Sequence, residues 1–199
     1  MKIGVFGGCF NPPHRAHKNI AQKLLEKGYV DIVIFVPTGD EYRKPGLAKF
    51  RHRVAMLEQM LADENRIELC TVGNTPMGQY TYQVLDYLQE KYESAELYFV
   101  CGTDNLNEIE TWRRYKYVLS NYRLLVIRRG EVDVKSILKK YKNFENRITL
   151  CNIDSEPLSS TMIREYIASD DKKVLELLDE SVLKYIREND LYKEGSRDR

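Results

Sequence analysis

The chain is poor in cysteine, and its four cysteines lie far apart in the sequence. Cys9, Cys70, Cys101 and Cys151 form no CxxC pair, a spacing that disfavours zinc binding and a dense disulfide framework. We therefore expect reduced, partly buried thiols.

Long hydrophobic runs and an excess of charge of one sign are also missing. No apolar stretch is long enough for a signal peptide or a bilayer span, so we expect a cytoplasmic protein without a membrane partner. The 31 lysines and arginines nearly balance the 30 aspartates and glutamates, which gives a formal net charge of +1. No overall field favours nucleic acid, and an anionic substrate must be held by local groups.

Two common nucleotide-binding signatures are missing as well. The chain has no GK[ST] phosphate loop, which excludes a P-loop enzyme. Gly4, Gly7 and Gly8, around the end of the first predicted strand, lack the GxGxxG spacing of a dinucleotide-binding redox enzyme. Any nucleotide must be bound by other elements.

What is present is an alternation of short β-rich runs with longer amphipathic stretches. Strands are predicted over residues 2–6, 31–36, 66–72, 96–100, 123–128 and 147–152. Helices are predicted over 17–27, 49–62, 81–92, 105–120 and 134–141, and then over 160–168, 171–178 and 181–189. This order predicts an α/β fold: a Rossmann-like, doubly wound parallel sheet with a helical C-terminal segment. For 199 residues we expect one domain, with the sheet core over 1–152, the helical part over 153–192 and a tail over 193–199.

The segment after the first predicted strand carries the strongest functional signal. Residues 7–17 read GGCFNPPHRAH, and parallel sheets bind ligands beyond the carboxyl ends of their strands. Gly7 and Gly8 let backbone amides approach a ligand closely, and amides at the start of the following helix favour an anion. His14 and His17 are one helical turn apart and would face the same bound group. A phosphate site is predicted here, and a metal site is not, because no third ligand lies near the two histidines in sequence.

A second segment, near the carboxyl end, has the same chemical character. Residues 158–164 read LSSTMIR. The hydroxyls of Ser159, Ser160 and Thr161 can cap a helix that begins there. Arg164, one turn further on, can reach phosphate oxygens with its fork of donors. Taken alone this is an ordinary helix start, but beside the histidine segment it predicts the second half of one phosphate site.

The pattern GxFxPxHxxH at residues 8–17 and the LSSTMIR segment resemble the two signatures of the nucleotidylyltransferase superfamily with an HxGH-type motif, although Ala16 replaces the usual glycine. The resemblance implies that an acceptor phosphate attacks the α-phosphorus of ATP and that pyrophosphate leaves, without a protein nucleophile. It implies catalytic roles for His14, His17 and Arg164, and Mg²⁺ held mainly by the ATP phosphates. The implied ATP-binding residues are Gly7, Gly8, Cys9, Phe10, His14, His17, Gly102, Asp104, Ser159, Ser160, Thr161 and Arg164.

Further stretches resemble one branch of the superfamily, the bacterial nicotinate mononucleotide adenylyltransferases. They are GQYTY at 78–82, YFVCGTD at 98–104 with a later Thr-Trp pair, VIRRG at 126–130 and VLKYIRENDLY at 182–192. A pyridine mononucleotide would then be the partner of ATP. Trp112 can stack on a pyridine ring, and the amides near Thr81 suit a carboxylate. The implied acceptor-binding residues are Lys44, Arg53, Tyr80, Thr81, Asp104, Trp112 and Arg128.

Four questions stay open at this point. Phosphopantetheine adenylyltransferases belong to the same superfamily, although their chains are shorter and lack the Trp112 region. A non-catalytic nucleotide-binding regulator would share the fold but would not need His14, His17 and Arg164 together. The sequence decides neither between nicotinate and nicotinamide mononucleotide nor between a monomer and a homo-oligomer.

Overall fold

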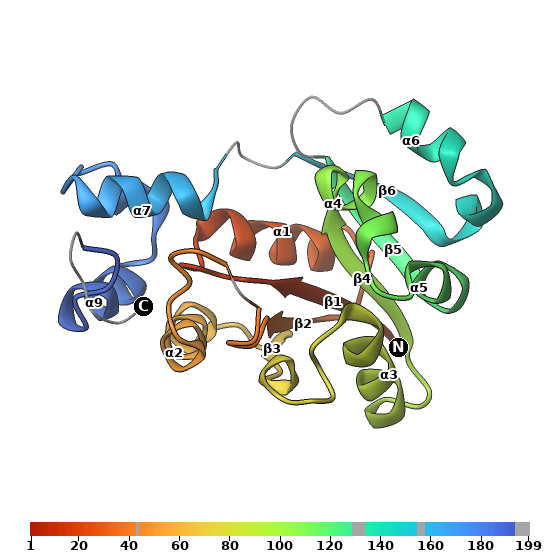
Figure 1. The fold of residues 1–199 in the computed structure, drawn as a ribbon, viewed down its shortest axis with the longest axis horizontal. Helices are drawn as coiled ribbons and strands as arrows, with labels where there is room; N and C mark the ends of the chain where they lie inside the picture. The colour runs from red at the N-terminus through yellow and green to blue at the C-terminus, as the bar shows by residue number, and fades with distance from the viewer. Residues whose placement is uncertain (43, 129–133, 155–157, 194–199) are drawn as a thin grey trace.

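The computed structural model describes residues 1–42, 44–128, 134–154 and 158–193. Arg129 and Gly130 of the VIRRG stretch, and residues 194–199 of the predicted tail, lie outside the described residues. Over the described ranges, six parallel strands form one sheet in the order β3-β2-β1-β4-β5-β6 (Figure 1). The strands are β1 (Lys2–Gly8), β2 (Ile32–Pro37), β3 (Ile67–Leu69), β4 (Glu96–Gly102), β5 (Arg123–Arg128) and β6 (Ile148–Asp154). The predicted Rossmann-like parallel sheet is confirmed.

Both faces of the sheet are buried, as the apolar strands require. In β1, Ile3 and Val5 belong to one hydrophobic cluster, and Phe6 belongs to the cluster on the opposite face. α1 (Arg15–Glu26) and α2 (Phe50–Leu61) pack in the cluster of Phe6. α3 (Thr81–Lys91) and α5 (Tyr115–Asn121) pack in the other. Near-continuous hydrophobic strands are typical of a parallel sheet that helices cover on both sides.

The helical C-terminal segment shares its core with one face of the sheet. It consists of α7 (Ser160–Ala168), α8 (Val174–Leu177) and α9 (Glu180–Glu188). Ile163 of α7 and Val182 of α9 are fully buried in the cluster that holds Phe6, and α9 packs on α2. Figure 1 shows α7 and α9 together at one end of the molecule, far from α6 (Val134–Lys140). Burial in a common core places the start of α7 in a fixed position relative to β1.

The prediction of one helix over residues 105–120 is wrong in detail. The chain forms α4 (Thr103–Asn107), a 3₁₀ turn η2 (Ile109–Thr111) and α5, which are separated by extended backbone at Trp112 and by Arg114 with φ +57°. No proline or glycine occurs between 103 and 121, so the sequence holds no strong signal for the break. The strand predicted over 66–72 is also shorter in the structure, where β3 ends at Leu69 and Val72–Asn74 forms a 3₁₀ turn, η1. A further 3₁₀ turn, η3 (Lys142–Arg147), precedes β6.

The strand order locates the place where a ligand fits. β1 is followed by β2 and β3 on one side, whereas β4, β5 and β6 extend the sheet on the other side of β1. The order therefore reverses between β1 and β4, and the crevice beyond their carboxyl ends is the expected binding position. The described part of the chain contains no helix that is long and apolar enough to cross a membrane.

Candidate active site

A cavity of about 970 Å³ opens beyond the carboxyl ends of β1 and β4. Sixteen of the eighteen site residues predicted from the sequence line it. They are Gly7, Gly8, Cys9, Phe10, His14, His17, Lys44, Tyr80, Thr81, Gly102, Asp104, Trp112, Ser159, Ser160, Thr161 and Arg164. Residues from the whole length of the chain thus meet at the position that the strand order predicts.

The two histidines stand together at the start of α1. His14 is the residue before the first helical turn, it is 3% exposed, and its ring stacks on that of His17 with 3.7 Å between centroids. The backbone N–H of His14 donates to Nδ1 of His17 over 3.2 Å. Because Nδ1 accepts this bond, the neutral His17 ring carries its proton on Nε2. The imidazole of His17 is therefore oriented as a donor through Nε2, as contact with a phosphate requires.

The LSSTMIR segment meets the histidine segment directly. Ser160 Oγ donates to the carbonyl of Pro12 over 2.9 Å, and Arg164 Nη1 donates to the carbonyl of Asn11 over 2.8 Å. Ser159 Oγ accepts from the backbone N–H of Met162 over 3.2 Å, which caps α7 as predicted. The convergence of the two motifs is confirmed, although Asn11 and Pro12 are its direct contacts rather than the histidines.

The opposite side of the cavity is aromatic and begins at α3. Trp112 stands edge-on to Phe99 of β4, with 5.4 Å between ring centroids and 86° between planes. Tyr80 precedes the first turn of α3 and is 40% exposed. The first amides of α3 carry the positive end of its dipole to the cavity at Thr81. A flat ring with a negative substituent fits these groups.

The structure does not bring Arg53 to the cavity, contrary to the sequence-based prediction. Its side chain is fully buried, and it donates to the carbonyls of Ala48 (2.7 Å), Thr38 (2.6 Å) and Cys9 (3.1 Å). Asp40 Oδ1 lies 3.3 Å from Nη2 and forms an ion pair with this guanidinium. Burial lowers the pKa of Arg53, and the charge of Asp40 opposes that change. Arg53 therefore ties together the loops after β1 and β2 and does not line the cavity.

Arg128, the other predicted acceptor contact, also lies outside the cavity. It is the exposed last residue of β5, whereas its neighbour Ile127 lines the cavity wall. Neighbouring residues of a strand point to opposite faces of the sheet, which explains why Ile127 lines the cavity and Arg128 does not.

Some cavity residues are missing from the sequence-based prediction. Asn11, Asn105, Glu108 and Arg113 all line the cavity. The guanidinium carbon of Arg113 lies 5.1 Å from the ring centroid of Tyr80, a cation–π distance. The predicted continuous helix over 105–120 gives no reason to expect Arg113 at the cavity. The observed break in the helix at Trp112 is what places Arg113 beside Tyr80.

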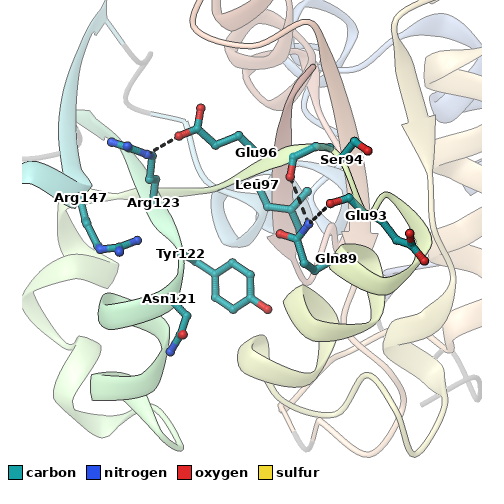
Figure 2. A pocket seen from close by; sticks show the side chains of 10 residues that line it. Gln89, Glu93, Ser94, Glu96, Leu97, Asn121, Tyr122, Arg123 and Arg147 are labelled. Carbon is teal, nitrogen blue, oxygen red and sulfur yellow. Dashed lines mark hydrogen bonds and ion pairs between the residues drawn. The ribbon is translucent and has the colours of Figure 1, made fainter.

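A smaller pocket of about 340 Å³ lies at the amino ends of β4 and β5 (Figure 2). It is lined by Glu96 and Arg123, the first residues of β4 and β5, which form an ion pair. Gln89 closes one wall by donating to the carbonyls of Glu93 and Ala95. None of the predicted site residues lines this pocket, which supports the larger cavity as the functional one.

Comparison with known proteins agrees with this fold and site. Residues 5–166 match the cytidylyltransferase-like family. The chain is 31% identical over 198 residues to the "Probable nicotinate-nucleotide adenylyltransferase" of Clostridium acetobutylicum, a match that covers 96% of this chain and 98% of the relative. A protein of the same name from Acholeplasma laidlawii is 31% identical over 191 residues, with 96% and 97% covered.

Solved structures show the same fold. The Plasmodium falciparum nicotinic acid mononucleotide adenylyltransferase complexed with NaAD has a TM-score of 0.81 at 21% identity, covering 96% of this chain and 97% of that one. The fold and the site thus define a nucleotidyltransferase of the HxGH type. The chain belongs to the cytidylyltransferase-like family and, within it, to the nicotinate-nucleotide adenylyltransferases.

The placement of Arg53 leads to a prediction about stability. Arg53→Lys should lower the free energy of unfolding by about 2–4 kcal/mol, because one ammonium cannot reach all the acceptors of the guanidinium and buried carbonyls lose their donors. Urea unfolding measures this change. The control is Arg51→Lys, exposed on the same helix, for which we expect a change within about 0.5 kcal/mol. If Arg53→Lys left the free energy of unfolding unchanged and raised KM for the acceptor, Arg53 would be a substrate contact, as the sequence predicts.

Proposed function

We propose that this chain transfers the adenylyl group of ATP to nicotinate mononucleotide, forming nicotinate adenine dinucleotide and pyrophosphate in NAD biosynthesis. The observation that carries the proposal is the meeting of the histidine segment with the start of α7 in one cavity that also contains Trp112. Relatives that span nearly the whole chain are named for this activity. Small, water-soluble substrates fit a cytoplasmic location.

The reaction that suits this site is a direct displacement. An oxygen of the acceptor phosphate forms a bond to the α-phosphorus of ATP while the bond from that phosphorus to the bridging oxygen breaks and pyrophosphate leaves. No covalent enzyme intermediate is needed, so positioning and stabilisation of charge supply the catalysis. His14 and His17 would donate to the phosphate oxygens at which negative charge increases. Arg164 and the hydroxyls of Ser160 and Thr161 would hold the outer phosphates of ATP.

Magnesium enters this proposal as part of the MgATP substrate. Within the described ranges, no group of three or more His, Cys, Asp or Glu side chains is arranged to hold a metal ion. Asp104 and Glu108 line the cavity as single, exposed carboxylates. Such a site fits Mg²⁺, which keeps several waters and binds mainly through substrate phosphates.

Pyrophosphate release from defined acceptors tests the proposed activity. The protein, ATP and Mg²⁺ should release pyrophosphate with nicotinate mononucleotide, measured by a coupled phosphate assay. Nicotinamide mononucleotide and 4′-phosphopantetheine are run in parallel to rank the acceptors. Turnover of phosphopantetheine without turnover of either pyridine nucleotide would overturn the proposed substrate. Binding of ATP without turnover of any acceptor would favour a nucleotide-binding regulator.

His17→Ala tests the proposed role of the imidazoles. We expect kcat to fall about a hundredfold or more, the scale of losing one donor to the transition state. The melting temperature should change little, because His17 is only partly buried. The matched control is His52→Ala, which changes the one histidine outside the cavity and should leave kcat within about twofold. A normal kcat in His17→Ala would remove His17 from the mechanism.

The preference for the acid over the amide of the pyridine ring is a finer part of the proposal. Arg113 lines the cavity over the ring of Tyr80, beside the first turn of α3. Its positive charge and the helix amides both favour a carboxylate over an uncharged carboxamide. Arg114 stacks on Tyr82 and Tyr117 but does not line the cavity.

Arg113→Met should therefore lower kcat/KM for nicotinate mononucleotide about fivefold, the scale of one exposed ion pair. The value for nicotinamide mononucleotide should change less than twofold, since a carboxamide has no charge to pair. Arg114→Met is the matched control, and it should leave the acid-to-amide ratio as it is. Equal losses with both acceptors in Arg113→Met would show that this arginine does not select the acid.

A further inference from the structure

The side chain of Asn11 joins the histidine segment to two distant parts of the chain. Asn11 is 3% exposed. Its Nδ2 donates to the carbonyl of Gly46 over 2.8 Å, and its Oδ1 accepts from the backbone N–H of Ala48 over 3.0 Å. The same Oδ1 accepts from the hydroxyl of Tyr192 over 2.8 Å. One buried amide therefore connects the histidine segment, the loop that carries Lys44 and the end of the chain.

Tyr192 reaches Asn11 because the chain turns sharply after α9. Leu191 N–H donates to the carbonyl of Ile186 over 3.0 Å, a bond that closes the helix end, and Leu191 is 2% exposed. With Leu191 anchored in the core, the next side chain is directed to the histidine segment. Burial raises the pKa of Tyr192, and the nearby guanidinium groups of Arg164 and Arg53 oppose this. The hydroxyl keeps its proton at neutral pH and acts as a donor.

Strained backbone flanks both ends of this hydrogen bond. Tyr192 has φ +64°, and Phe10, which precedes Asn11, has φ +48°. Bulky side chains rarely adopt this left-handed region, and such strain persists only where surrounding contacts hold it. Phe10 is held by burial against Phe6 and Phe35. Tyr192 does not line the cavity, and its hydrogen bond to Asn11 connects it to a residue that does.

We propose that Tyr192 is a positioning residue for adenylyl transfer: its hydroxyl fixes Asn11 and thereby the segment that presents His14 and His17. The expected effect on kcat rests on the proposed function. The bonds to Gly46 and Ala48 tie the side chain of Asn11 to the loop before α2, and the bond from Tyr192 is its tie to the end of the described chain. Loss of the hydroxyl leaves the segment folded but free to shift, and shifts of an ångström at reacting groups lower rates strongly.

Tyr192→Phe tests this role because it removes one oxygen and keeps the ring. We expect kcat to fall fivefold or more while KM for both substrates changes less than twofold, since placement of transition-state donors is affected most. Tyr185→Phe is the matched control. Its hydroxyl lies 3.0 Å from Nδ1 of His52, in the same C-terminal segment and away from the cavity. If both variants lowered the melting temperature equally and Tyr192→Phe left kcat unchanged, Tyr192 would have a structural role only and the proposal would fail.

A double-mutant cycle shows whether the effect passes through the histidines. In a His17→Ala background, Tyr192→Phe should lower kcat less than twofold, because residues that act together are not additive. Full additivity would contradict the proposal. Hydrogen–deuterium exchange of residues 10–17 is measured in parallel without substrate; it should accelerate in Tyr192→Phe and not in Tyr185→Phe. If the wild type turns over no pyridine mononucleotide, the proposed function fails, and the exchange result alone decides whether Tyr192 holds the segment.

Discussion

Two backbone carbonyls, those of Asn11 and Pro12, hold the site together. Arg164 and Ser160 of α7 donate to them over 2.8 Å and 2.9 Å, across more than 140 residues of sequence. These bonds add to the buried apolar contacts between the helical C-terminal segment and the sheet. With them, the carboxyl end of β1 and the start of α7 form one wall of one cavity. Hydrogen bonds fix the relative positions of these groups, whereas the shared hydrophobic core provides most of the stability.

A second constraint acts on the other side of the same segment. The guanidinium of Arg53 is a buried charge, and it is stabilised by three carbonyl oxygens from the loops after β1 and β2 and by one carboxylate. It holds the carbonyl of Cys9, two residues before Asn11. The histidine segment is therefore fixed from one side by α2 and from the other by α7 and Tyr192. Pre-organisation of this kind lowers the cost of arranging donors around a phosphate.

The sequence predicts the parts of this protein that depend on local pattern. Gly7 and Gly8 end a strand that hydrophobicity alone identifies, the two histidines follow it, and Ser159 caps α7 where its neighbours indicate a helix start. The features that escape prediction depend on tertiary contacts. In the sequence Arg53 looks like any surface arginine, and only the tertiary structure shows that its side chain is fully buried. The break at Trp112 has no glycine or proline to mark it, and the bond between Tyr192 and Asn11 joins residues 181 positions apart.

The two prolines explain why the site needs its distant donors. A proline nitrogen carries no hydrogen, so the peptide groups before Pro12 and Pro13 offer only an acceptor. These are the carbonyls of Asn11, which lines the cavity proposed to bind a triphosphate, and of its neighbour Pro12. An uncovered carbonyl oxygen repels an anion and, when buried, lacks the partner it needs. Arg164 and Ser160 satisfy both oxygens, and Arg164 adds a positive charge at the same point. The rigid proline segment that places His14 and His17 is thus compatible with a phosphate site only because α7 covers its carbonyls.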